Sequence, residues 1–156
     1  MRLLRFVGRS LPVRNTRIEF GFCIFLACAL LLVPFRLVIA WLLAITIHES
    51  FHYLAMIFMG VKVNGFKLTS RGIKLYTAPM EEYQECICAL AGPLGGSLLL
   101  LLKRWMPCTA LCGFVQSCFN LLPIYPLDGG RAIRSLFVML RNNIGTEKYL
   151  ANKANK

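Results

Sequence analysis

Four apolar runs, separated by shorter polar segments, dominate the hydrophobic pattern of this chain. They cover about residues 20–34, 37–59, 86–102 and 108–122. A helix needs roughly 20 apolar residues to cross the hydrocarbon core of a bilayer, and the second run meets this length. The first run is short, and we expect it to begin near Ile18 or to continue past Arg36. The pattern predicts an all-α membrane protein with about four transmembrane helices.

Between the second and third runs the period changes from helical to alternating. Apolar and polar residues alternate over most of residues 61–68 and again over 73–76. Alternation is typical of β-strands, and Gly72 suits the turn of a hairpin. The pattern predicts a small β-hairpin here. We weigh two interpretations equally: an ordinary connection, or an exposed strand edge at residues 61–68 that pairs with an extended substrate.

Charge and composition restrict the class of protein further. The 156 residues suit one domain, and 57% are hydrophobic while only 16% are charged. Eighteen basic residues against seven acidic ones give a net charge of +11. The basic residues lie mostly between the apolar runs, as in a membrane protein, and not in a nucleic-acid-binding pattern.

The basic residues also predict an orientation. With four spans, fifteen of them fall on one side and only Arg36, Lys103 and Arg104 on the other, so both termini are expected in the cytoplasm. The single domain then divides into a basic cytoplasmic arm (1–17), a transmembrane core (18–130) and a cytoplasmic tail (131–156). We expect the arm to be retained, because no small-residue cleavage site follows the first run.

The seven cysteines all lie in or beside apolar runs. Their odd number and the absence of extended extracellular loops argue against a disulfide framework. Two pairs, Cys86 with Cys88 and Cys108 with Cys112, have spacings that could bind metal. We favour the simpler interpretation, in which they are small packing residues.

The second run contains the two histidines of the chain, in the segment His48-Glu49-Ser50-Phe51-His52. Ionisable groups at bilayer depth are costly and usually have a function. Residues four apart share one face of a helix, so His48 and His52 can bind one zinc ion. Glu49 between them can then reach a water molecule on the metal.

The third and fourth runs carry the remaining unusual residues. Gly92 and Gly96 form a small-residue face beside Pro93, and we favour close packing against the second run as its role. The fourth run ends in the segment from Asn120 to Arg131, in which two prolines stop the helix. Asp128 follows on a chain reversal at Gly129-Gly130 and is a natural third zinc ligand.

These two motifs together closely resemble the site-2 protease family of intramembrane zinc metalloproteases. That family carries HExxH on one transmembrane helix and N-x-x-P-x-P-x-x-D-G on another. The second proline falls one place later here, at Pro126, and Gly96 stands where many members have asparagine. Ala91-Gly92-Pro93 is similar to the short motif of the family's middle helix. The resemblance covers about residues 37–135 and is greatest to the sporulation type, which processes an inactive sigma-factor precursor.

The resemblance implies one Zn²⁺ ion per chain, held by His48, His52 and Asp128, with water in the fourth position. Glu49 is implied as the general base. Asn120 would donate to the oxyanion or hold the substrate backbone, or alternatively cap the broken helix end. The expected substrate is a membrane-spanning or membrane-associated protein, with a possible regulatory membrane partner. The expected location is a bacterial cell membrane.

Two rival functions remain at this point. The chain could be a catalytically silent membrane scaffold or adaptor that binds protein partners, but such a protein has no physical need for Glu49. A zinc sensor or transporter would need polar groups along a path through several spans. The first and third runs supply almost none, which makes transport the weaker hypothesis.

Overall fold

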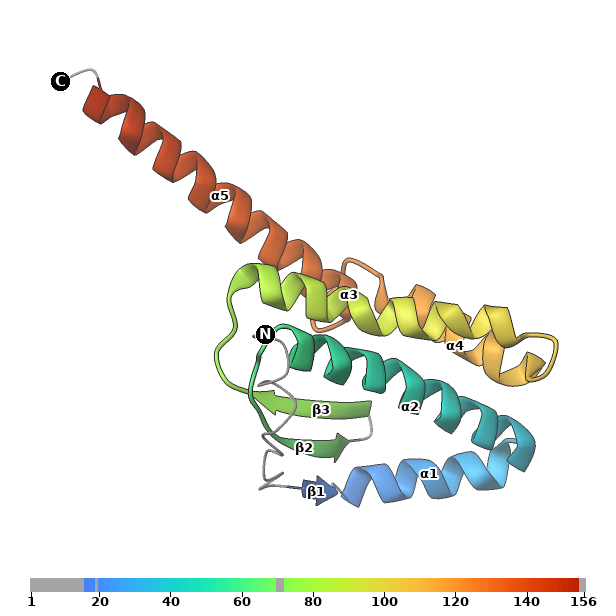
Figure 1. The fold of residues 1–156 in the computed structure, drawn as a ribbon. Helices are drawn as coiled ribbons and strands as arrows, with labels where there is room; N and C mark the ends of the chain where they lie inside the picture. The colour runs from blue at the N-terminus through green and yellow to red at the C-terminus, as the bar shows by residue number, and fades with distance from the viewer. Residues whose placement is uncertain (1–15, 19, 70–71, 155–156) are drawn as a thin grey trace, which may run out of the picture.

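The computed structural model describes residues 16–18, 20–69 and 72–154 (Figure 1). Over this part of the chain, helices predominate, and a small three-stranded sheet combines one strand before the first helix with two strands after the second. In chain order the elements are β1 (Thr16–Ile18), α1 (Phe20–Leu32), α2 (Phe35–Phe58), β2 (Val63–Thr69), β3 (Gly72–Thr77), α3 (Glu82–Leu98), the 3-10 helix η2 (Leu99–Leu102), α4 (Pro107–Asn120) and α5 (Asp128–Ala154). Of the predicted arm, residues 1–15 lie outside the described residues.

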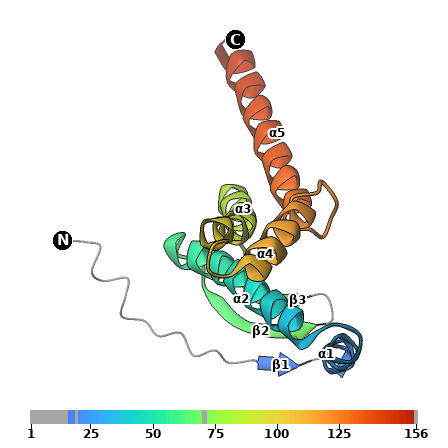
Figure 2. The ribbon, with the colours of Figure 1, turned by 90° about the vertical axis from the view of Figure 1, so that its right-hand side faces the viewer.

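Helix α2 lies at the centre of the fold. Helices α3 and α4 cover one side of it, while α1 and the sheet lie on the other (Figures 1 and 2). One buried cluster joins Ala44 of α2 to Leu99 and Ala110. A second cluster joins Met56 to the start of the sheet and to Cys88 of α3. These small clusters hold α2 against α3 and α4, which is the region where the histidines lie.

The predicted hairpin is confirmed, because β2 and β3 pair in antiparallel fashion. Strand β1, which was not predicted, pairs in parallel with β2 along Phe66–Leu68. The hypothesis of a free strand edge at residues 61–68 is therefore wrong over that stretch, since β2 is the central strand. Three residues of β1 are too few to show an alternating pattern in the sequence.

Two helices of the described residues are long and apolar enough to cross a membrane, namely α2 and the continuous segment Glu82–Leu102. At 1.5 Å per residue, the 24 residues of α2 span about 36 Å. Only 28% of the most apolar window of α2, and 39% of that of Glu82–Leu102, is buried. Helices α1 and α4 occupy the other two predicted spans with 13 and 14 residues, so the count of four spans stays a prediction.

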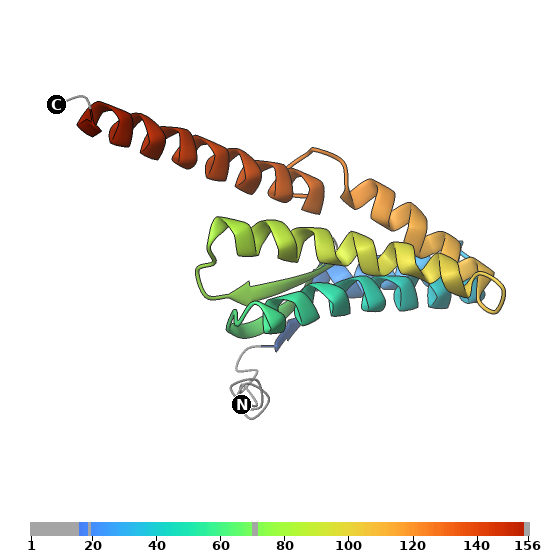
Figure 3. The ribbon, with the colours of Figure 1, turned by 45° about the horizontal axis from the view of Figure 1, so that its top comes forward.

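Residues 128–154 form one long helix, α5, which projects away from the other helices (Figures 1 and 3). Residues 131–156 were predicted only as a cytoplasmic tail, and this helix was not predicted. The apolar residues of α5 are too few and too widely spaced to predict a membrane-spanning helix. Five of them nevertheless recur at helical spacing. These five side chains are exposed: Ile133, Leu136, Phe137, Leu140 and Ile144. Ala132 and Ser135 are buried, and α5 packs on α3.

Candidate metal centre

The two histidines lie on the buried face of α2. From Ala40 to Met56 the buried residues of this helix recur at every fourth position, and His48 and His52 are two of them. A spacing of four keeps residues on one face of a helix. The histidines are 1% and 5% exposed. The two imidazoles therefore share one face, as the spacing predicted, and that face is buried.

Asp128, at the start of α5, lies beside this pair, although it is 76 residues after His52 in the sequence. Its Oδ2 atom lies 3.2 Å from His48 Nε2 and 3.1 Å from His52 Nε2. The two Nε2 atoms are themselves 3.2 Å apart. The three atoms form a nearly equilateral triangle. Ligands about 2.0 Å from a tetrahedral zinc ion are about 3.3 Å from one another, so the triangle fits one face of such a site.

The hydrogen bond made by His52 Nδ1 shows why a cation would be stable at this triangle. His52 Nδ1 lies 2.6 Å from the carbonyl oxygen of Cys88, to which it donates a hydrogen bond. In a neutral imidazole with its proton on Nδ1, Nε2 presents a lone pair. That lone pair faces a carboxylate oxygen and a second imidazole. A positive ion between them relieves the repulsion, and a carbonyl behind a metal-binding histidine is the usual arrangement.

Two glycines place Asp128 by letting α5 begin against the segment that follows α4. A Cβ atom at Gly129 would overlap the carbonyl oxygen of Leu121, and one at Gly130 would collide with Ile124. No other residue could occupy these positions without moving the backbone. The Gly-Gly pair therefore does more than permit a chain reversal, because it allows the close contact that brings Asp128 to α2.

The glycines of α3 allow its close approach to the histidines. A Cβ atom at Gly92 would overlap the His52 imidazole, and one at Gly95 would overlap the Phe51 ring. At Gly96 the collision would be with Ser117 of α4. Close packing on α2, the interpretation favoured from the sequence, is thus confirmed for Gly92, whereas Gly96 packs mainly against α4. Gly92 also makes room for the ring of His52.

Asn120, the last residue of α4, also reaches the group. Its Nδ2 atom lies 3.1 Å from His48 Nε2, and the residue is half-buried. Glu49 is also half-buried and follows His48 on α2, three positions before His52. Residues three apart on a helix are neighbours on its surface, so Glu49 flanks the same face as His52.

Sequence reasoning missed three contributors to this site. These are the carbonyl of Cys88, the guanidinium of Arg131 and the carboxylate of Glu85. Arg131 Nη1 lies 3.7 Å from Asp128 Oδ1. Its position three residues after Asp128, on one helix, was a signal that could have indicated the contact. No sequence signal marks a backbone carbonyl as a partner of a distant histidine.

No cysteine side chain in the described part of the chain belongs to the group that could hold a metal ion, although the backbone carbonyl of Cys88 contacts His52. The seven cysteines are free of disulfides, and only Cys88 is buried. Among the described residues, the group that could hold a metal ion consists of His48, His52 and Asp128. Cys88 and Cys112 pack in or against buried apolar clusters, as the packing interpretation expects, and for the other cysteines that interpretation stays a prediction.

Of three comparisons with known proteins, the one with solved structures found a similar fold. No protein-family model matches the chain, and no curated protein matches it. Among solved structures, the site-2 protease from Methanocaldococcus jannaschii superposes with a TM-score of 0.65 and 24% identity. The match covers 83% of this chain and 70% of that protein. At this identity the similarity establishes the fold, and the expected resemblance is confirmed to that extent.

Proposed function

We propose that this protein is an intramembrane zinc metalloprotease. The observation that carries the proposal is the triangle of His48 Nε2, His52 Nε2 and Asp128 Oδ2, with sides of 3.1–3.2 Å. It lies on the fold of a site-2 protease, next to a glutamate on the same helix as both histidines. Fold alone does not imply function, so the proposal depends on the residues of the site.

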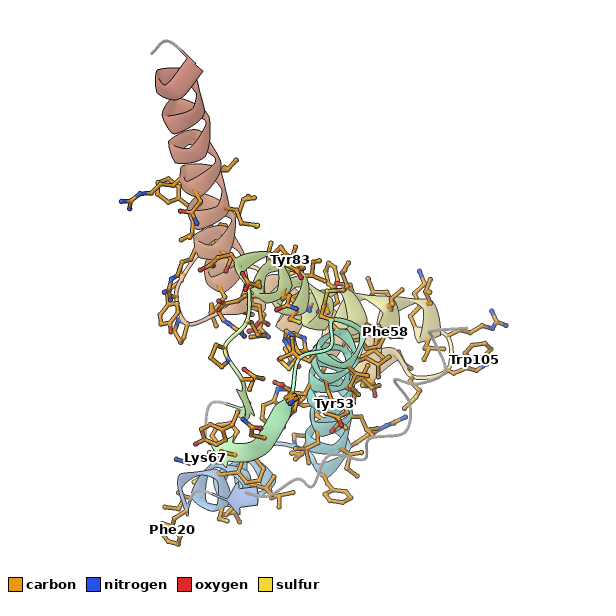
Figure 4. The ribbon with its side chains drawn as sticks, turned by 60° about the vertical axis from the view of Figure 1, so that its left-hand side comes forward. Phe20, Tyr53, Phe58, Lys67, Tyr83 and Trp105 are labelled. Carbon is orange, nitrogen blue, oxygen red and sulfur yellow. The ribbon has the colours of Figure 1, made fainter. Side chains whose placement is uncertain are left out.

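The surface of the helices supports a location in a membrane. Large apolar side chains are exposed on α1–α4 and on the turn before α4, among them Phe20 at 78% and Trp105 of that turn at 74%. Figure 4 shows that these two aromatic side chains point away from the rest of the molecule. A soluble protein rarely exposes contiguous apolar surface on this scale, whereas lipid acyl chains cover it at no cost.

His48, His52 and Asp128 would hold the zinc ion. Two imidazoles and a carboxylate are the donor set of several catalytic zinc sites, which keep a fourth position open. Bound zinc polarises a peptide carbonyl and makes water a nucleophile near neutral pH. The hydrogen bond from His52 Nδ1 to Cys88 would keep Nε2 directed at the ion.

Two further side chains would act on the substrate. The carboxylate of Glu49 would accept a proton from the attacking water. It would then donate this proton to the leaving amine. Asn120, whose Nδ2 atom is already beside His48, donates a hydrogen bond to the oxyanion that develops on the scissile carbonyl. This position favours a role in the site over capping of the end of α4.

The substrate would be a membrane-spanning or membrane-associated protein whose helix unwinds locally before cleavage. A peptide carbonyl in an intact helix is engaged in a hydrogen bond to the residue four positions later and is inaccessible. We further propose four spans, both termini in the cytoplasm and a bacterial cell membrane. A sigma-factor precursor or regulator, as for the sporulation type, is the proposed substrate class.

The test is cleavage of single-span and membrane-associated substrates by the purified protein in liposomes, with zinc content measured in parallel. We expect Glu49→Gln to abolish cleavage and to retain zinc. Ser50→Gln, an amide at an exposed neighbouring position of α2, is the matched control and should leave both unchanged.

Other outcomes separate the proposal from its alternative. Full zinc occupancy without cleavage by wild type, over a broad panel of substrates, would favour the catalytically silent scaffold. Cleavage that survives in Glu49→Gln would remove Glu49 from the mechanism. Absence of zinc from purified wild type, including after incubation with zinc, would contradict the metalloprotease proposal itself.

A further inference from the structure

The two carboxylate oxygens of Asp128 have different neighbours. Oδ2 faces the imidazoles of His48 and His52 at 3.2 and 3.1 Å. Oδ1 lies instead near the guanidinium of Arg131, whose Nη1 atom is 3.7 Å distant. A carboxylate has two equivalent oxygens in solution, and either or both can bind a metal. Here the protein distinguishes them, because each has its own charged or ligating partner.

Arg131 is itself held from another helix. Its Nε atom donates a hydrogen bond to Glu85 Oε1 of α3, at 3.4 Å. The side chains of Arg131 and Glu85 are each 27% exposed, so most of this pair is shielded from water. An ion pair of this kind is screened less than one on the surface. The guanidinium therefore has a defined position between α3 and the start of α5.

The planar guanidinium suits this bridging position. Arginine presents five N–H groups in a rigid fork, so one side of the group can engage Glu85 while another faces Asp128. Lysine offers a single mobile ammonium and would not fix both carboxylates in the same way. Rotation of the Asp128 carboxylate would separate Oδ1 from Nη1, and the attraction opposes it. The arrangement thus favours presentation of Oδ2 alone to the histidines.

We propose that Arg131, anchored by Glu85, is a positioning residue that keeps Asp128 as a one-oxygen ligand of the metal. This inference rests on the proposed zinc site. Arg131 does not contact the ion in this arrangement and acts only through Asp128. Partners that orient metal ligands typically contribute about 10–100-fold in metal affinity.

The experiment measures zinc affinity of the full-length purified protein by competition with a chromophoric chelator. Arg131→Gln should weaken zinc binding by about 10–100-fold. Glu85→Gln should weaken it less, because Arg131 remains. The double variant should be no weaker than Arg131→Gln alone, since Glu85 acts through Arg131.

Matched controls separate positioning from a general effect of charge or folding. Arg134→Gln makes the same change at an exposed arginine one turn along α5, and it should bind zinc like wild type. Arg131→Lys retains the charge without the fork and should fall between wild type and Arg131→Gln. If Arg131→Gln does not fold, the zinc affinities of Arg131→Lys and Glu85→Gln test the proposal instead.

Cobalt(II), bound in place of zinc, supplies a spectroscopic readout of coordination. We expect the visible absorption of the cobalt protein to change in Arg131→Gln, because Oδ1 becomes free to approach the ion. The spectrum should be unchanged in Arg134→Gln. A merely structural role of Arg131 would lower stability without altering the cobalt spectrum of the folded fraction.

The outcomes are distinguishable from those for the proposed function. Zinc affinity of folded Arg131→Gln within about twofold of wild type, with an unchanged cobalt spectrum, would overturn the positioning role and leave the zinc site intact. An equal loss in Arg134→Gln would also overturn it, by assigning the effect to net charge. A wild-type protein that binds neither zinc nor cobalt would overturn both proposals together.

Discussion

The candidate metal centre has two halves that are built in different ways. Helix α2 supplies His48, Glu49 and His52 within five consecutive residues of one helix. Asn120 and Asp128 come instead from the end of α4 and the start of α5, with a non-helical segment between them. The geometry of the first half follows from helix periodicity. That of the second half depends on contacts with other elements.

The contrast extends to what holds each half in place. Backbone hydrogen bonds of α2 keep the two histidines four positions apart on one face, and the Cys88 carbonyl of α3 orients the ring of His52. Asp128 depends on the close approach of Gly129 to Leu121 and on the charge of Arg131. The second half is therefore the part of the site that substitutions or metal removal should disturb most. Four predictions test this difference, from the largest expected effect to the smallest.

Removal of one ligand from either half should have the largest effect. His52→Ala and Asp128→Ala should each lower zinc affinity by at least about 100-fold, since a structural zinc site derives roughly 10–16 kcal/mol from four ligands. Chelator competition measures the affinity, with Ser50→Ala on the exposed side of α2 as control. Wild-type affinity in Asp128→Ala would exclude the α4–α5 half from the metal site.

Asn120→Ala should separate substrate chemistry from metal binding. We expect peptide cleavage to fall by about 10²–10³-fold, the usual effect of losing one oxyanion donor. Zinc content should stay at the wild-type level, because Asn120 is not a ligand in the proposed site. Thermal unfolding distinguishes the alternative. A cap of the end of α4 would lower the melting temperature and leave the cleavage rate per folded molecule unchanged.

Glycine substitutions compare the packing that supports each half. Gly92→Ala and Gly129→Ala both introduce a clash, and overpacking of this kind typically costs about 1–3 kcal/mol of stability. The obstacle at Gly92 is the side chain of His52, whereas at Gly129 it is the backbone of Leu121. A ring can shift more easily than a backbone carbonyl, so we expect the greater loss of zinc affinity in Gly129→Ala.

The control for this comparison is Gly21→Ala in α1, away from the metal centre. Zinc affinity by chelator competition and thermal stability should both be at wild-type levels or higher in this variant. Equal zinc affinity in Gly92→Ala and Gly129→Ala would contradict the stated difference between the two halves.

Removal of zinc from the intact protein should have the mildest and most local effect. We expect amide hydrogen exchange to accelerate at the start of α5, where the Arg131 amide donates to the Leu127 carbonyl at 3.0 Å. Amides of α2 around His48 should keep their protection, because that helix does not depend on the ion. Acceleration in α2 as large as in α5 would count against the distinction between the halves.

The half of the site on α2 was easier to predict from the sequence than the half formed by α4 and α5. The histidine pair, its buried face and the antiparallel hairpin were all predicted from short-range periodicity. Asp128 was selected as a candidate partner because it follows a proline-broken helix end, and the structure brings it to the histidines. Strand β1 and helix α5 were missed. One is too short to show a pattern, and the other carries too few apolar residues to read as a span.

By itself, the sequence determined the four apolar helical segments, the hairpin and the chemical character of the candidate site. Local spacing sets which residues share a helix face, and side-chain type sets what they can bind. Only the tertiary structure decided which oxygen of Asp128 meets the histidines, and that Cys88 and Arg131 hold two of the candidate ligands in place. These contacts join residues of different helices. Their geometry depends on how closely the backbones pack, and no periodicity along the chain encodes that distance.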